Sequence, residues 1–149
     1  MQLKKVRDLK NLTIYSHEKT QLKERPIVYE GISAGFPSPA EDFKEVRISL
    51  DAALVKNDEA TFYARVRGNS MIDANIEDGD LLVVDRSIES RNGKIAVCMI
   101  DGEFTIKRLK VEKDCVYLIP ENKNYKPIKV VEGNELIIWG IVTYVIKQV

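Results

Sequence analysis

The chain has 149 residues, the size of one domain or of one domain with an appended arm. Its 23 basic and 23 acidic residues cancel, so the total charge gives no support for a general electrostatic grip on DNA or on an anionic membrane. Two cysteines and one histidine cannot build a disulfide framework and make a poor zinc set, so we expect no structural metal and no cofactor.

The first 34 residues are basic and the remainder is acidic. Seven bases and four acids give residues 1–34 a net charge of +3, and 16 bases and 19 acids give the rest −3. Charges recur every few residues at the N terminus, and the longest apolar run, at 136–146, has eleven residues against the roughly 20 of a membrane-spanning helix. We therefore expect a cytoplasmic protein without a membrane anchor, whose polar leader holds at most a weak helix around Leu3–Leu9.

Residues 32–41, ISAGFPSPAE, are the clearest break in the chain. Pro37 and Pro39 remove two backbone donors and bias Phe36 and Ser38 toward extended conformations. Such a stretch can be neither a helix nor a central strand. It predicts an extended linker between an arm and a body.

Beyond this break the apolar residues recur with a period of two, as in β-strands. Turn signals separate the runs, and Asp101-Gly102 between two of them predicts a hairpin with a primed turn. At this spacing the runs predict an all-β fold, an antiparallel sandwich or barrel, with helix confined to short turns near 51–55 and after Ser70. The candidate strands lie at 61–67, 81–84, 94–100, 104–110, 116–120, 128–131 and 136–147.

The residues that could carry chemistry point away from a histidine-based hydrolase. The only histidine, His17, lies 53 residues before Ser70 in the leader, so we expect it in solvent or against a partner. A serine can instead be activated by an unprotonated lysine. Ser70 directly follows a predicted strand, and Gly68 lets the chain turn there, which can expose the hydroxyl and point nearby amides outward as oxyanion donors. On local sequence the alternative, a loop serine that caps a helical turn, stays open.

The candidate lysine is Lys107, in the predicted strand 104–110. Alternation places it on one face with Thr105 and Leu109, which permits a partly apolar setting. To act as a base near pH 7, its pKa would have to fall from roughly 10.4 to about 7, and burial can supply such a shift. The alternative, an edge-strand lysine in solvent, is the commoner fate of lysines and stays open on these residues alone.

Four segments together resemble the LexA/UmuD family of self-cleaving Ser-Lys proteases (peptidase family S24), and most closely its UmuD-type branch. They stand in the family's order, and the 37 residues between Ser70 and Lys107 are typical of it. The resemblance covers about Gly31 to the C terminus. The segments are SAGFPSPAEDF at 33–43, GNSMI at 68–72, EDGDLLVVD at 77–85 and DGEFTIKRL at 101–109.

The resemblance implies a compact LexA- or signal-peptidase-like β-domain, of the β-clip or barrel-like kind, with an extended N-terminal arm. It implies that Ser70 is the nucleophile, that Lys107 is its general base and that the Ala34–Gly35 bond is cut. The backbone amides of Asn69 and Ser70 would be the oxyanion donors. The implied organisation is an arm at 1–34 removed by self-cleavage, a linker at 35–44 and a peptidase domain at 45–149.

The length of the arm separates the branches of that family. Thirty-four residues are too few for the helix-turn-helix domain of a LexA-type repressor, so we expect no sequence-specific DNA binding. The UmuD-type branch implies self-cleavage on a RecA–single-stranded DNA filament in the SOS response. It also implies a trimmed homodimer that serves a UmuC-like Y-family polymerase (DNA polymerase V) in error-prone translesion synthesis. Two alternatives remain: a non-enzymatic module that regulates a polymerase or RecA by binding, and a LexA-like antirepressor with the same cleavage chemistry.

Overall fold

The computed structural model describes residues 2–18, 23–27 and 46–149. The Ala34–Gly35 bond and the predicted linker lie outside these residues. Among the described residues, no helix is long and apolar enough to cross a membrane. In chain order the elements are β1 (Gln2–Asp8), β2 (Leu12–Glu18), β3 (Glu24–Ile27), β4 (Val46–Ser49), α1 (Leu50–Leu54), η1 (Asp58–Ala60), β5 (Thr61–Val66), η2 (Ile72–Ala74), β6 (Leu81–Asp85), β7 (Ile95–Ile100), β8 (Glu103–Val111), β9 (Val116–Ile119), β10 (Ile128–Val130) and β11 (Leu136–Ile146).

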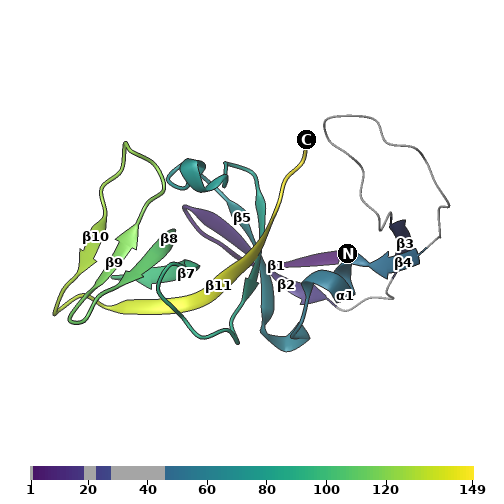
Figure 1. Ribbon diagram of the computed structural model, residues 1–149, viewed down its shortest axis with the longest axis horizontal. Helices are drawn as coiled ribbons and strands as arrows, with labels where there is room; N and C mark the ends of the chain where they lie inside the picture. Colours follow the sequence, from purple (N-terminus) through teal and green to yellow (C-terminus); the bar gives the residue numbers. More distant parts are fainter. Residues whose placement is uncertain (1, 19–22, 28–45) are drawn as a thin grey trace.

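The predicted all-β fold is confirmed as one large antiparallel sheet. Nine strands follow the order β1-β2-β5-β6-β11-β7-β8-β9-β10, and β3 pairs with β4 separately. The C-terminal strand β11 lies in the middle of the sheet, where its first half pairs with β7 and its second half with β6. Figure 1 shows β9 and β10 at one end of the molecule, β3 and β4 at the other, and β11 running between the two halves of the sheet.

The apolar run of β6 is buried on both faces, because alternate side chains enter different clusters. Leu82 and Val84 join the main core, whereas Leu81 and Val83 join a smaller cluster with Tyr63. A strand that is covered on both faces has a continuous run of apolar residues in its sequence, and not an alternation of apolar and polar residues. A third cluster, under β7, β8 and β9, contains Cys98, which is fully buried as expected of a small core residue.

The predicted hairpin at Asp101-Gly102 joins β7 to β8. Both residues have positive φ, +48° and +82°, as a primed two-residue turn requires. The Asp101 carboxylate accepts hydrogen bonds from the Glu135 amide at 2.9 Å and from Asn134 Nδ2 at 2.8 Å. The turn is therefore tied to the start of β11.

The weak helix expected around Leu3–Leu9 is wrong, because residues 2–8 form strand β1. Apolar residues at every third position imitate a helical face, but pairing with β2 decides the conformation. Strand β2 in turn pairs with β5, which buries Leu12 and Ile14 in the main core. The leader thus contributes two strands to the sheet.

His17 is also placed differently from the prediction. Its side chain is 2% exposed, and Nδ1 lies 2.9 Å from the Tyr63 hydroxyl. Carboxylate oxygens of Asp51 and Asp58 lie 3.8 Å from its two ring nitrogens. The prediction of a solvent-facing histidine failed because it treated the leader as separate from the body, whereas β2–β5 pairing brings His17 beside Tyr63.

Candidate active site

Ser70 lies on the loop that leaves β5, where the chain turns sharply. Gly68 has φ +93°, a left-handed conformation that favours glycine, and its amide donates to Asp78 Oδ1 at 2.7 Å. The next side chain after the serine, Met71, is buried in the main core and anchors the loop. Ser70 itself is half-buried, so its hydroxyl is held at the rim of the core and not inside it.

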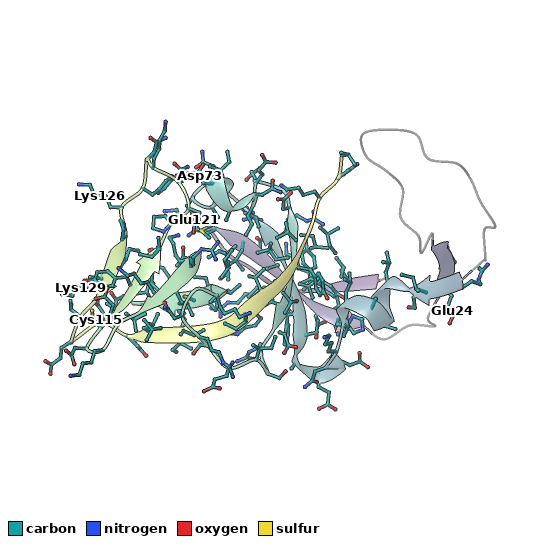
Figure 2. The ribbon with its side chains drawn as sticks, viewed as in Figure 1. Glu24, Asp73, Cys115, Glu121, Lys126 and Lys129 are labelled. Carbon is teal, nitrogen blue, oxygen red and sulfur yellow. The ribbon has the colours of Figure 1, made fainter. Side chains whose placement is uncertain are left out.

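The serine loop, defined here as residues 67–74, is held by hydrogen bonds with the loop that follows β9. Asn122 Nδ2 donates to the Asn69 carbonyl at 2.8 Å, and the Tyr125 hydroxyl donates to Asn69 Oδ1 at 2.9 Å. The Asp73 amide donates to the Glu121 carbonyl at 2.7 Å, and Figure 2 shows these two residues next to each other. Sequence reasoning missed all of these contacts, because a polar loop 48 or more residues away along the chain carries no local sign of what it touches.

Lys107 reaches the serine from β8, a strand paired on both sides. Its Nζ lies 3.3 Å from Ser70 Oγ, 2.6 Å from Thr105 Oγ1 and 3.0 Å from the Ile106 carbonyl oxygen. The residue is only 7% exposed. The structure thus brings Ser70 and Lys107 together and excludes the solvent-exposed alternative for the lysine. Thr105 shares a face of β8 with Lys107, as the alternation predicts.

The surroundings of Lys107 favour its neutral form. Burial lowers the pKa of Lys107, because the charged amine loses hydration that the protein does not fully replace. A thiolate at Cys98 would oppose this effect, but burial raises the pKa of that thiol to about 12, so it stays uncharged. The amine can therefore lose its proton at a lower pH than an exposed lysine.

A pocket with a cavity volume of about 150 Å³ lies against both side chains. It is bounded by the serine loop, by the Lys107 strand β8 and by the turn between β1 and β2. Val66, Met71 and Ile106 give the pocket part of its wall as apolar surface, and the serine loop supplies polar groups. Its lining residues are Asn11, Val66, Arg67, Gly68, Asn69, Ser70, Met71, Thr105, Ile106, Lys107 and Tyr125.

The remaining predictions for the site concern the cleaved bond, the oxyanion donors and metal binding. Ala34 and Gly35 lie outside the described residues, between β3 and β4, whose facing ends Ile27 and Val46 are paired. Asn69 and Ser70, the expected oxyanion donors, both border the pocket. Within the described parts of the chain, no three His, Cys, Asp or Glu side chains gather closely enough to hold a metal ion.

Comparison with known proteins shows the family to which the chain belongs. Residues 26–143 match the model of the Peptidase S24-like family. The chain belongs to the peptidase S24 family. It is 43% identical to protein MucA of Salmonella typhimurium over 121 residues, 80% of this chain and 82% of MucA. It is 40% identical to protein SamA of the same species over 123 residues, 83% of this chain and 85% of SamA.

The similarity also extends further toward the N terminus than the sequence motifs indicated. The chain is 37% identical to the LexA repressor of Alcanivorax borkumensis over 139 residues, 93% of this chain and 67% of the repressor. A match of that coverage includes strand β2. The S24 family contains LexA- and UmuD-like self-cleaving proteases, so a serine protease is the kind of enzyme to which this chain is related.

Proposed function

We propose that the protein is a self-cleaving serine protease that cuts its own Ala34–Gly35 bond. The observation that carries the proposal is the 3.3 Å separation between Lys107 Nζ and Ser70 Oγ at a buried lysine. A buried amine with a lowered pKa is the base that a serine nucleophile needs when no histidine is beside it.

The proposed reaction follows the ordinary course of acyl transfer. The neutral Lys107 amine takes the proton of the Ser70 hydroxyl while Oγ attacks the carbonyl carbon of Ala34. The amides of Asn69 and Ser70 stabilise the oxyanion, and the Lys107 ammonium then protonates the leaving amine of Gly35. Water hydrolyses the ester between Ser70 and Ala34 with the amine again as base. Thr105 and the Ile106 carbonyl orient the amine throughout.

The cellular role that we propose comes from the UmuD-type resemblance. In the cytoplasm, a RecA–single-stranded DNA filament stimulates the cut, and the processed chain acts as a homodimer that is the accessory subunit of an error-prone Y-family polymerase. The similarity to MucA and SamA supports this branch.

The decisive experiment is intact mass under denaturing conditions, after incubation at mildly alkaline pH and separately with RecA filament and ATP. We expect a fragment that begins at Gly35 from the wild type and none from Ser70→Ala or Lys107→Ala. Lys123→Ala is the matched control, since this exposed residue lies outside the pocket, and it should be cut like the wild type. An uncut wild-type chain under every condition would refute the protease and favour a binding module.

A further inference from the structure

The N-terminal hairpin, defined here as residues 2–18 with strands β1 and β2, precedes the proposed cut in the sequence. All other strands of the large sheet follow the cut. Self-cleavage at Ala34–Gly35 would break its covalent link to the body. The inference below therefore rests on the proposed function. The contacts of the hairpin determine what happens to it once that link is broken.

The inner strand of the hairpin is paired with the sheet over residues 12–16. Strand β2 pairs with β5 in register from Leu12 opposite Val66 to Ser16 opposite Phe62. One further bond runs from the Arg67 amide to the Asn11 carbonyl at 2.9 Å. Without the hairpin, β5 would become an open sheet edge with unpaired donors and acceptors.

The side chains of β2 belong to the main core. Leu12 is 0% exposed and Ile14 is 3% exposed, and both pack in one cluster with Ala64 and Val66 of β5. Departure of the hairpin would expose these apolar surfaces to water, which is the principal cost that burial avoids in folding. The hairpin is therefore packed as an internal strand pair and not as a surface appendage.

Polar contacts hold both ends of β2. The Arg67 guanidinium donates to the Leu9 carbonyl at 2.8 Å, to Asp8 Oδ1 at 2.5 Å and to Thr13 Oγ1 at 2.9 Å. At the other end, His17 contacts the Tyr63 hydroxyl. None of these bonds involves the segment in which the cut lies, so hydrolysis at Ala34–Gly35 removes none of them.

The hairpin also forms part of the pocket wall. Asn11, in its turn, borders the pocket and donates from Nδ2 to the Phe104 carbonyl of β8 at 3.0 Å. Arg67, which the hairpin carbonyls and carboxylate hold, borders the pocket as well. The shape of the pocket beside Ser70 therefore depends on residues that the proposed cut would disconnect.

We propose that the N-terminal hairpin stays bound to the edge of β5 after self-cleavage, so that the processed protein is a two-piece chain with an intact sheet and pocket. Cleavage then breaks the covalent connection without removing strands from the large sheet. The occupant of the β5 edge is residues 2–18 of the chain itself, held non-covalently.

The test compares native and denaturing mass spectra of the same cleaved sample. The denaturing spectrum should show two fragments. The native spectrum should show one species with the mass of the uncut chain plus one water, or a multiple of it. A native species made of residues 35–149 without residues 1–34 would overturn the proposal.

Two substitutions in the hairpin provide a matched pair. Ile14→Ala truncates a buried contact and should speed the exchange of the bound fragment for a labelled peptide of residues 1–34 by about tenfold or more. Val6→Ala removes apolar atoms from a side chain that is 56% exposed and should leave the exchange rate unchanged. Equal exchange rates for the two variants would contradict the role of core packing in retention.

Retention can also be tested without the protein's own activity. A Ser70→Ala chain with the recognition sequence of an unrelated site-specific protease inserted after Ala34 can be cut by that protease. The hairpin should again remain bound in the native spectrum, and its loss would overturn the proposal. If the wild type is never cut but this variant keeps its hairpin, the proposed self-cleavage fails while the retention inference stands.

Discussion

Lys107 is the residue whose protonation state governs the proposed chemistry, because only its neutral amine can accept the serine proton. Its neighbours within reach are neutral oxygens, at Ser70, Thr105 and the Ile106 carbonyl. Such partners accept hydrogen bonds from an ammonium but do not offset the loss of hydration as a carboxylate would. Because the lost hydration outweighs these hydrogen bonds, burial lowers the pKa of this lysine.

The pH dependence of cleavage should follow this residue. Below the lowered pKa of Lys107 the amine is protonated, so the rate should rise with pH and then level off once the pKa is passed. Lys107→Arg should remove the activity at every pH, because a guanidinium stays charged. Cleavage rates of the folded chain between pH 6 and 10 would check this, and a flat wild-type profile would contradict the lysine as base.

Asn122 contacts the serine loop but not the Ser70 hydroxyl. Its replacement therefore tests whether the loop must be held in place for Ser70 to react. Asn122→Ala removes the bond from its side chain to the Asn69 carbonyl, and a hydrogen bond of this kind contributes about 0.5–1.5 kcal/mol to the placement of the loop. We expect cleavage to slow by about ten- to a hundredfold with an unchanged pH midpoint. A shifted midpoint in the pH–rate profile would show that Asn122 acts on Lys107 instead of on the loop.

At the scale of elements, β11 is shaped by one residue that has no room for a side chain. A Cβ at Gly140 would lie 2.6 Å from Val84 Cγ1 and 3.2 Å from Arg86 Cγ, and the register of β11 against β7 shifts between Ile138 and Gly140. Close approach of neighbouring strands and an irregular register are the usual reasons for a glycine inside a strand.

Gly140→Ala should therefore destabilise the fold by about 1–3 kcal/mol, since a tightly packed neighbour has to move. The control is Val145→Thr in the same strand, which keeps β-branching at a position that is 38% exposed and should change stability far less. Denaturant unfolding of both variants in the Ser70→Ala background gives the comparison. Equal midpoints would show that the sheet can relax around the added methyl group.

Strands from residue 61 onward were predictable because their environment is regular. Alternation identified β5, a continuous apolar run identified β6, and the Asp101-Gly102 turn fixed the pairing of β7 with β8. Motif resemblance identified Ser70 and Lys107, which the fold places in contact. For the strands and the hairpin, the information lies within a few residues of the feature that it predicts, whereas Ser70 and Lys107 required four segments spread over residues 33–109.

Features that depend on distant pairing were not predictable. Strand β1 carries a helix-like spacing of apolar residues, and only its partner β2 selects the extended form. His17 looked isolated until the β2–β5 pairing buried it beside Tyr63. The bracing of Asn69 by Asn122 and Tyr125 has the same origin, because it depends on where two loops meet in space.

At the scale of the whole molecule, charge separates the two products of the proposed cut. Residues 1–34 carry +3 and residues 35–149 carry −3, whereas the complete chain is neutral. If the cleaved protein keeps residues 1–34, it should elute from an anion-exchange column near neutral pH at the same salt concentration as the uncut chain. The same sample in urea should yield a more acidic body that is retained longer, and early separation under native conditions would contradict this expectation.

The central place of β11 also has a consequence for the order of events during synthesis. Strand pairing between the half of the sheet next to Ser70 and the half that contains Lys107 runs through β11, which follows every other described strand in the sequence. A nascent chain that still lacks residues 136–146 cannot complete this sheet, so the proposed Ser70–Lys107 pair lacks the strand framework that holds it in the folded protein. The self-cleavage that we propose should therefore begin only after residues 136–146 have been made.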